Sequence, residues 1–260
     1  MAIVFRKRPG LVAYITCGDP DLDTSREVAL AAIRAGADVI ELGVPFSDPV
    51  ADGPVIQRAS ERALHHGTNL AGVLDIAGQV RQQSKEGLVI FSYLNPILQF
   101  GLDKFCSAAA EAGVDGALVT DLPVEEAGDY LRAMKAHKLA PVFLAAPTST
   151  DERLRQIAKH SRGFVYAISR TGITGARQEL AGDAQSLVER LRAHTRLPIA
   201  VGFGVSTPEQ FAEVGSFADA AVVGSAIVQC IEQNRGREAA AVSEFLTFLT
   251  ANVQPARASG

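Results

Sequence analysis

Two spacings of apolar residues alternate along the chain. Short, nearly continuous apolar runs are separated by stretches of about 10 to 15 residues in which apolar side chains recur every three or four positions. Continuous runs are typical of strands buried on both faces of a parallel sheet, because a strand with one wet face would alternate. The eight runs that we expect to be strands are Leu11–Thr16, Val39–Leu42, Leu88–Tyr93, Ala117–Val119, Pro141–Leu144, Phe164–Ile168, Ile199–Val201 and Ala220–Val223.

The longer stretches predict amphipathic helices. In Ser25–Ala35 the apolar positions fall on one helical face, Thr24 is a candidate N-cap, and Gly36 ends the run. The same pattern recurs in Leu102–Ala112, Glu125–His137, Glu152–His160 and Ala184–His194. We also expect a helix over Val55–His66 and an amphipathic closing helix over Glu238–Val253.

Strand and helix therefore alternate eight times in 260 residues. This arithmetic fits an α/β protein of the (βα)8 TIM-barrel type, which takes about 250 residues. The alternative is a doubly wound open sheet. No linker interrupts the pattern, so we expect a single domain over residues 1–260, with a short N-terminal segment (1–10) and a frayed tail (254–260).

Charge and composition narrow the class of protein. The 25 Lys and Arg residues against 29 Asp and Glu residues give a net charge of −4, and the basic residues are scattered, which disfavours nucleic-acid or lipid binding. No apolar stretch is long enough to span a membrane, and Leu11–Cys17 is too short for a signal peptide. The odd set Cys17, Cys106 and Cys230 indicates reduced thiols and a cytoplasmic protein.

Glu41 is the most informative single residue. It interrupts the apolar run Val39–Leu42, so the barrel would place a carboxyl group among branched side chains at the end where active sites form. Burial would raise its pKa toward neutrality and suit it to general acid–base catalysis. The alternative is a structural Glu paired with a hydroxyl or amide.

Asp52 is the second candidate acid. It follows Glu41 by eleven positions, in a loop rich in proline and glycine. The alternative for Asp52 is an Asx turn or an N-cap of the helix over Val55–His66.

Glycine clusters follow the last three predicted strands and suggest a phosphate site. They are Gly172–Gly175, Gly202–Gly204 and Gly224-Ser225, the last of which opens a helix. Glycines let backbone N–H groups approach an anion, and barrel enzymes often bind phosphate after strands 7 and 8.

Other chemistries lack support in the sequence. The five histidines fall on predicted helices, no metal-ligand spacing occurs, and no Lys ends a predicted strand as a Schiff-base aldolase would need. Neither a P-loop nor a complete dinucleotide fingerprint is present.

One long motif resembles a known family. Glu41–Pro54 reads ELGVPFSDPVADGP and closely resembles the signature of the tryptophan synthase alpha subunit family. The similarity extends from about Leu11 to Ile231, through Tyr14–Pro20, Asp121–Glu126, Ser169–Gly175 and Gly202–Ser206.

The resemblance implies reversible retro-aldol cleavage of indole-3-glycerol phosphate to indole and glyceraldehyde 3-phosphate, with no metal or cofactor in this chain. It implies that Glu41 is the acid/base at indole C3 and the adjacent hydroxyl, and that Asp52 holds the indole N–H. It places Phe91, Thr120 and Phe203 at the indole pocket, Tyr166 near the glycerol chain, and Gly175, Gly204, Gly224 and Ser225 at the phosphate. It also implies that Tyr14, Tyr93 and Thr174 bind the substrate.

The resemblance also implies a partner and two mobile loops. The partner is a PLP-dependent beta subunit in an α2β2 heterotetramer, to which indole passes, and the loops lie at about residues 48–56 and 171–180. The alternatives are a stand-alone lyase that releases indole and a catalytically silent scaffold.

The chain departs from the family at its start and in the pocket. Members of the family usually begin with a helix that covers the bottom of the barrel. Because only ten residues precede the first strand here, we expect the bottom of the barrel to be less covered. Phe91 and Thr120 replace smaller residues and would alter the pocket slightly.

Overall fold

The computed structural model describes residues 3–168, 177–202 and 204–251. In these parts of the chain nine parallel strands form one sheet in the order β5-β4-β3-β2-β1-β9-β8-β7-β6. The strands are β1 (Gly10–Thr16), β2 (Val39–Gly43), β3 (Gly87–Ser92), β4 (Gly116–Val119), β5 (Ala140–Val142), β6 (Leu144–Ala145), β7 (Val165–Ile168), β8 (Ile199–Gly202) and β9 (Ala220–Val223). Each predicted strand is present within one or two residues, and the predicted fifth strand is divided into β5 and β6.

The divided fifth strand closes the barrel. β5 pairs with β4, β6 pairs with β7, and Phe143 lies between the two halves. The Phe143 carbonyl accepts a hydrogen bond of 3.1 Å from Tyr166 N, and the Pro141 carbonyl accepts one of 2.8 Å from Arg162 N. Consecutive strands are therefore neighbours all round the ring, which confirms the (βα)8 barrel and excludes the doubly wound sheet.

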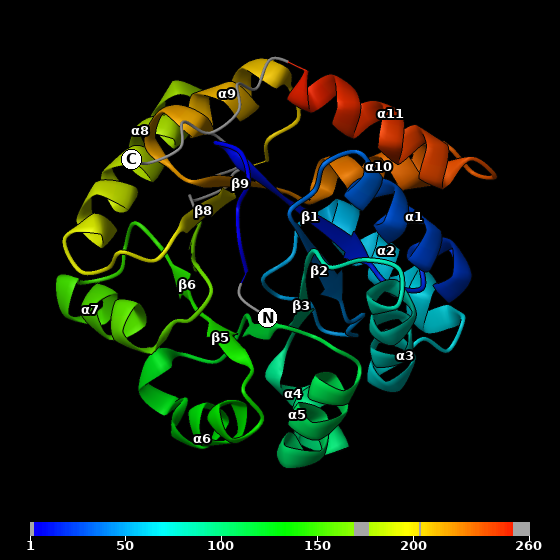
Figure 1. Ribbon diagram of the computed structural model, residues 1–260, viewed down its shortest axis with the longest axis horizontal. Helices are drawn as coiled ribbons and strands as arrows, with labels where there is room; N and C mark the ends of the chain where they lie inside the picture. The colour runs from blue at the N-terminus through cyan, green and yellow to red at the C-terminus, as the bar shows by residue number, and fades with distance from the viewer. Residues whose placement is uncertain (1–2, 169–176, 203, 252–260) are drawn as a thin grey trace.

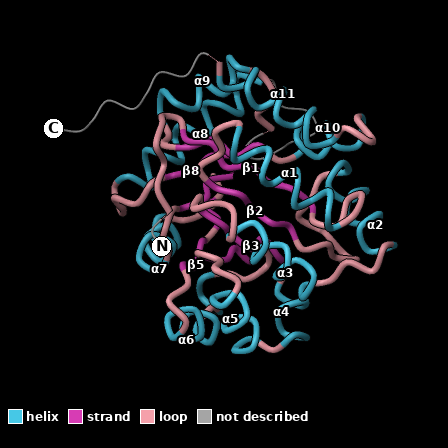
Figure 2. The backbone as a smooth tube through the Cα atoms, turned by 45° about the vertical axis from the view of Figure 1, so that its right-hand side comes forward, coloured by secondary structure: helices cyan, strands magenta, loops and turns pink. Residues whose placement is uncertain are grey.

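Helices surround the ring of strands (Figures 1 and 2). Their bounds are α1 (Leu22–Arg34), α2 (Pro54–His65), α3 (Leu70–Arg81), α4 (Leu94–Phe100), α5 (Leu102–Glu111), η1 (Val124–Glu126, a 3-10 turn), α6 (Gly128–Ala136), α7 (Asp151–His160), α8 (Arg177–Arg192), α9 (Pro208–Phe217), α10 (Ser225–Gln233) and α11 (Glu238–Thr250). The predicted closing helix is α11, and no helix of the described residues is long and apolar enough to cross a membrane.

Three local details differ from the sequence prediction. The N-cap of α1 is Asp21, whose Oδ1 accepts from Thr24 N at 2.7 Å, so the prediction of Thr24 as the cap was wrong. Helix α3 was not predicted, and its Gly72 allows close packing, since a Cβ there would lie 2.9 Å from Leu22 Cδ1 of α1. Helix α4 was not predicted either; it tolerates Pro96 because the proline lies in its first turn.

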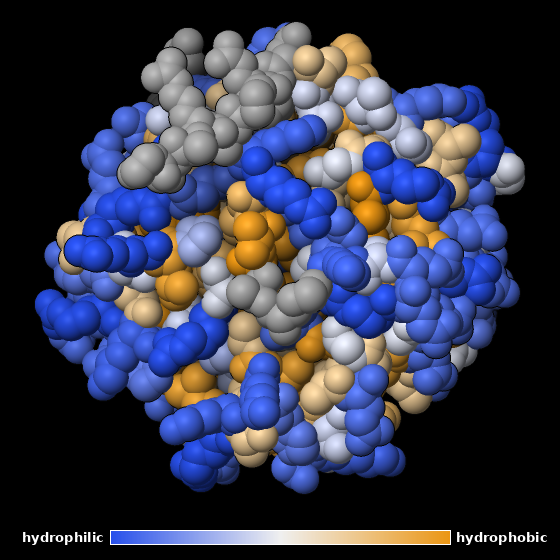
Figure 3. Space-filling view, in the orientation of Figure 1, coloured by the Kyte–Doolittle hydropathy of each residue, from blue (hydrophilic) through white to orange (hydrophobic). Residues whose placement is uncertain are grey.

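The N-terminal segment covers the bottom of the barrel. Ile3 is buried against the interior side chains, and the Phe5 ring meets Phe164 edge-on at 6.0 Å. The first described residues, in dark blue, lie near the middle of the ring in Figure 1, and apolar side chains gather around the centre of the same face in Figure 3. These contacts supply the cover that we expected the short segment to lack.

Three aspartates bridge neighbouring strands at the bottom of the barrel. Asp38, Asp115 and Asp219 each lie just before a strand and accept a backbone N–H at the start of an adjacent one, at 2.8 to 3.0 Å. Asp115 is also held by Arg81 at 2.7 Å. Carboxylates that fix the strand ends in this way suit the face that stabilises a barrel rather than the face that reacts.

Candidate active site

Glu41 lies in the interior of the barrel at β2. Its side chain is 0% exposed, and neither carboxyl oxygen has a hydrogen-bond partner among the described residues. Burial raises its pKa to about 8, so the group is protonated at neutral pH. The structural alternative, a Glu paired with a hydroxyl or amide, finds no such partner in the described part of the chain.

Two tyrosines share the interior with Glu41. Tyr14 is the register neighbour of Glu41 on β1, and Tyr166 projects from β7. Glycines make room for both hydroxyls: a Cβ at Gly43 would lie 2.4 Å from Tyr14 Oη, and one at Gly202 would lie 2.7 Å from Tyr166 Oη. Burial first, and then the nearby carboxyl groups, raise the pKa of both phenols, so they remain hydrogen-bond donors.

Asp52 lies in the loop between β2 and α2. Its Oδ2 accepts a hydrogen bond of 3.2 Å from Tyr93 Oη, and the same oxygen of Tyr93 accepts one of 2.9 Å from Ala51 N. The N-cap of α2 is Gly53, so the structure excludes the N-cap alternative for Asp52. Burial raises the pKa of Asp52 to about 6, although the Tyr93 hydrogen bond opposes this. Between about pH 6 and 8, Asp52 is ionised and Glu41 is protonated.

Phe91 and Thr120 complete the wall on the side of β3 and β4. The Phe91 ring meets Tyr14 edge-on at 5.0 Å, and both pack with Val55 and Ile56 of α2. Thr120 directly follows β4, and its backbone N–H donates to the Ser92 carbonyl at 2.9 Å. The structure therefore brings Tyr14, Glu41, Phe91 and the start of α2 together.

A helix N-terminus opens beside this pocket. Gly224 is the N-cap of α10 and makes no side-chain cap hydrogen bond, and a Cβ on it would lie 3.5 Å from Tyr14. Ser225, the first residue of α10, is exposed. Gly204 has φ of +82°, which favours glycine. The predicted residues Thr174, Gly175 and Phe203 lie outside the described residues.

Thiols and histidines lie apart from these groups. Cys17 and Cys106 are buried, and burial raises the pKa of Cys106 to about 11. His137 pairs with Asp103 on the outer helices at 3.1 Å. In the parts of the chain that the structure describes, no group of three or more His, Cys, Asp and Glu residues could hold a metal ion.

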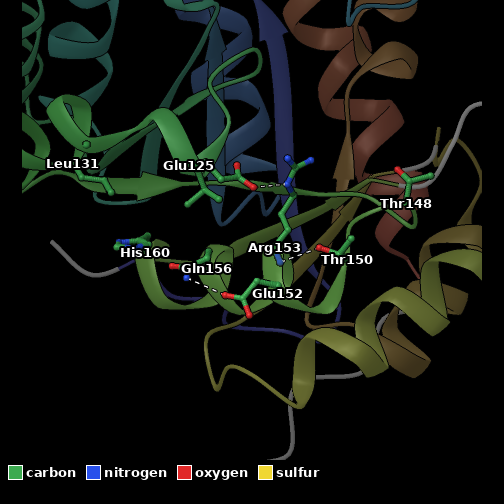
Figure 4. Close-up of a pocket in the computed structure, with 10 residues that line it drawn as sticks. Glu125, Leu131, Thr148, Thr150, Glu152, Arg153, Gln156 and His160 are labelled. Atoms are coloured by element: carbon green, nitrogen blue, oxygen red, sulfur yellow. Dashed lines mark hydrogen bonds and ion pairs between the residues drawn. The ribbon is translucent and has the colours of Figure 1, made fainter.

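A separate cavity of about 650 Å³ lies outside the barrel between α6 and α7. Figure 4 shows two pairs of polar side chains in its lining: Arg153 Nε donates to Glu125 at 2.7 Å, and Gln156 Nε2 donates to Glu152 at 3.2 Å. No predicted site residue lines this cavity, and the site remains the mouth of the barrel.

The fold, with one carboxyl group of raised pKa on β2 and a second in the loop that follows β2, defines a (βα)8-barrel enzyme. Comparison with known proteins gives the family. The family model described as tryptophan synthase alpha chain matches residues 2–256, and the chain belongs to this family, whose members are lyases of tryptophan biosynthesis.

Relatives and solved structures agree. The chain is 56% identical over 227 residues to the tryptophan synthase alpha chain of Solibacter usitatus (strain Ellin6076), covering 87% of this chain and 85% of the relative. It is 46% identical over 244 residues to that of Geobacter sulfurreducens (strain ATCC 51573 / DSM 12127 / PCA), covering 94% and 92%. The structure of tryptophan synthase subunit alpha from Legionella pneumophila str. Paris superposes with a TM-score of 0.86 at 38% identity, covering 94% and 92%. A chain of Mycobacterium tuberculosis tryptophan synthase gives 0.88 at 37%, covering 96% and 94%.

Proposed function

We propose that this chain catalyses the reversible retro-aldol cleavage of indole-3-glycerol phosphate to indole and glyceraldehyde 3-phosphate. The observation that carries the proposal is the Glu41 carboxyl group, which is fully buried, has no partner among the described residues, and has a pKa raised to about 8. A group that is protonated at neutral pH in a dry pocket can donate a proton to carbon. Membership of the tryptophan synthase alpha chain family supports indole-3-glycerol phosphate as the proposed substrate.

Glu41 performs two proton transfers in this proposal. It donates its proton to C3 of the indole ring, which converts indole into a leaving group. As a carboxylate it then accepts the proton of the adjacent side-chain hydroxyl while the C3–C bond breaks and the aldehyde forms. The proton count balances, because Glu41 ends the cycle protonated.

Asp52 stabilises the charge that C3 protonation creates. Protonation at C3 leaves positive charge on the ring nitrogen, and an ionised Asp52 that accepts the indole N–H balances it. Tyr93 orients Asp52 through its 3.2 Å hydrogen bond. Tyr14 and Phe91 form the apolar wall of the indole pocket, with Phe203 and Thr120 as further contacts.

The remaining residues hold the glycerol phosphate. Tyr166 contacts the glycerol chain, and the phosphate binds at Gly224 and Ser225, where uncapped N–H groups of α10 favour an anion. Gly204, Thr174 and Gly175 complete this phosphate site.

A beta subunit is the proposed partner, in an α2β2 complex of the cytoplasm. The apolar side chains of Val50 and Leu98 are 87% and 56% exposed, and they lie in the loop that contains Asp52 and in the helix that follows Tyr93. Exposed apolar side chains beside an active site suit a docking face. The PLP belongs to the partner, and this chain requires no cofactor for the retro-aldol step.

The proposal is tested by measuring indole released from indole-3-glycerol phosphate by this chain, alone and with added beta subunit. We expect slow turnover alone and strong activation by the partner. High activity that the partner leaves unchanged would favour the stand-alone lyase. Absence of indole formation under both conditions would overturn the proposed function and favour a silent scaffold.

We expect kcat/KM to follow a bell-shaped pH profile, rising at about pH 6 and falling at about pH 8. The rise reflects ionisation of Asp52, and the fall reflects loss of the Glu41 proton that C3 requires. Initial rates of indole formation from pH 5 to 9 measure the profile. Because the substrate phosphate also titrates near pH 6, the acidic limb is assigned to Asp52 only if the residual activity of Asp52→Asn lacks it. A profile that rises through pH 8 contradicts the role of Glu41.

A further inference from the structure

Five charged side chains form a network between β1, α2 and α10. We call Asp19, Arg58, Arg62, Glu232 and Arg235 the Asp19 network. Asp19, in the turn after β1, accepts hydrogen bonds from Arg62 Nε at 2.9 Å, Arg62 Nη2 at 2.7 Å and Arg235 Nη2 at 3.1 Å. Arg62 Nη1 donates to Glu232 Oε1 at 2.8 Å, and Arg58 donates to both oxygens of Glu232, at 3.0 and 3.2 Å.

Arg62 is the centre of the network. The Asp19 side chain is 0% exposed, so its charge requires several donors, and the Arg62 guanidinium bonds both of its oxygens. The third nitrogen of the same guanidinium bonds Glu232. One planar group thus fixes α2 to the β1 turn and to α10 at once. A lysine ammonium cannot reproduce this fork.

The two helices joined by Arg62 each begin at the proposed site. Helix α2 starts at Pro54, two residues after Asp52, and α10 starts at Ser225 beside Gly224. The helices lie side by side at the right of the ring in Figure 1, and Ala59 of α2 packs with Val228 of α10 and with Tyr14. Arg62 and Glu232 lie two turns or so beyond these starts, where they lock the pair.

We propose that Arg62 is a positioning residue. It fixes the position of α2 relative to α10 and thereby keeps Asp52 correctly placed relative to the phosphate-binding start of α10. This inference rests on the proposed function. The alternative is that the network only stabilises the fold, in which case its loss would lower stability without a specific effect on turnover.

Arg62→Lys separates these possibilities. We expect kcat for indole-3-glycerol phosphate cleavage to fall by about tenfold to a hundredfold, with KM changed by less than about threefold, because the substrate still binds while Asp52 is misplaced. The matched control is Arg81→Lys, since Arg81 also bonds a buried aspartate, Asp115, at 2.7 Å but at the bottom of the barrel. We expect a comparable loss of thermal stability in the control, with kcat within about twofold of the parent. Equal kcat losses in both variants, or no loss in Arg62→Lys, would overturn the inference.

Hydrogen exchange gives a readout that does not depend on turnover. We expect glyceraldehyde 3-phosphate to slow amide exchange in α10 and α2 of the parent chain, and in α10 alone after Arg62→Lys. Glu232→Ala leaves Asp19 paired with Arg62 and Arg235 and should lose the α2 response in the same way. This variant replaces Arg62→Lys in the experiment if Arg62→Lys does not fold. An unchanged α2 response in these variants would overturn the coupling. If the parent binds this product but forms no indole, the proposed function fails while the coupling is still tested.

Discussion

Replacing Glu41 with Gln is expected to lower indole formation from indole-3-glycerol phosphate by about a thousandfold or more while the barrel stays folded. Glutamine matches the shape of the side chain but has no proton of suitable acidity for C3 and cannot accept the hydroxyl proton. The measurement is kcat with the beta subunit present, the condition in which we expect the highest parent activity. Substantial residual turnover would exclude Glu41 as the acid/base.

The same substitution is expected to stabilise the protein at alkaline pH. The fold raises the pKa of Glu41 from 4.5 to about 8, so the folded state favours the protonated carboxyl group. The contribution of this group to the free energy of unfolding is therefore fully present below about pH 4.5 and is lost progressively as the pH rises to about 8. The substituted glutamine does not ionise and has no such dependence on pH. At pH 9 the free energy of unfolding of Glu41→Gln should therefore exceed that of the parent by an amount on the order of a few kcal/mol, and at pH 4 the two should differ little. Urea unfolding at the two pH values measures the difference.

A matched control separates loss of chemistry from loss of a buried carboxyl group. Glu238 is also buried, but it lies at the start of α11 outside the barrel, where it accepts from Gly236 N at 3.0 Å. Glu238→Gln should therefore keep turnover near that of the parent. Equal inactivation of the two variants would contradict a specific role for Glu41.

Replacing Asp52 with Asn is expected to lower kcat by about a hundredfold to a thousandfold with little change in KM. An asparagine can still accept the Tyr93 hydrogen bond and the indole N–H, so the bound geometry survives. It lacks the negative charge that balances the ring nitrogen after C3 protonation, and the loss therefore falls on the transition state.

Asp48→Asn is the control for this second prediction. Asp48 lies in the same loop and is exposed, where it accepts from Ser47 Oγ. The assay uses the isolated chain, so that a partner contact at Asp48 cannot affect the result. A loss below about tenfold in Asp52→Asn, or the same loss in Asp48→Asn, would contradict the proposed role.

The barrel could be predicted from sequence because strands buried on both faces leave continuous apolar runs. Ala220–Val223 was predicted with its observed bounds, and Val39–Leu42 within one residue. The inward orientation of Glu41 follows from period-two alternation with Val39, whose side chain belongs to the interior cluster. Burial and the raised pKa of Glu41 could likewise be anticipated from its neighbours.

Features that depend on distant residues could not be predicted. The Asp19 network joins positions 43 and 170 residues apart, a pairing that no local pattern records. Helix α3 contains two glycines and α4 contains a proline, so the local helix propensity argues against both helices. Packing against neighbouring elements outweighs this low propensity. The division of the fifth strand at Phe143 likewise depends on which neighbours each half meets.

That division has a consequence for how the enzyme becomes complete. A cut at Phe143 would give two fragments, the first with Glu41, Asp52 and Thr120, the second with Tyr166, Gly224 and Ser225. Neither fragment would hold both Glu41 and Asp52, the proposed catalytic carboxyl groups, and the start of α10, the proposed phosphate site. Two such fragments would therefore recover catalysis only when they associate, because the short strands β5 and β6 must come together there to close the ring of strands.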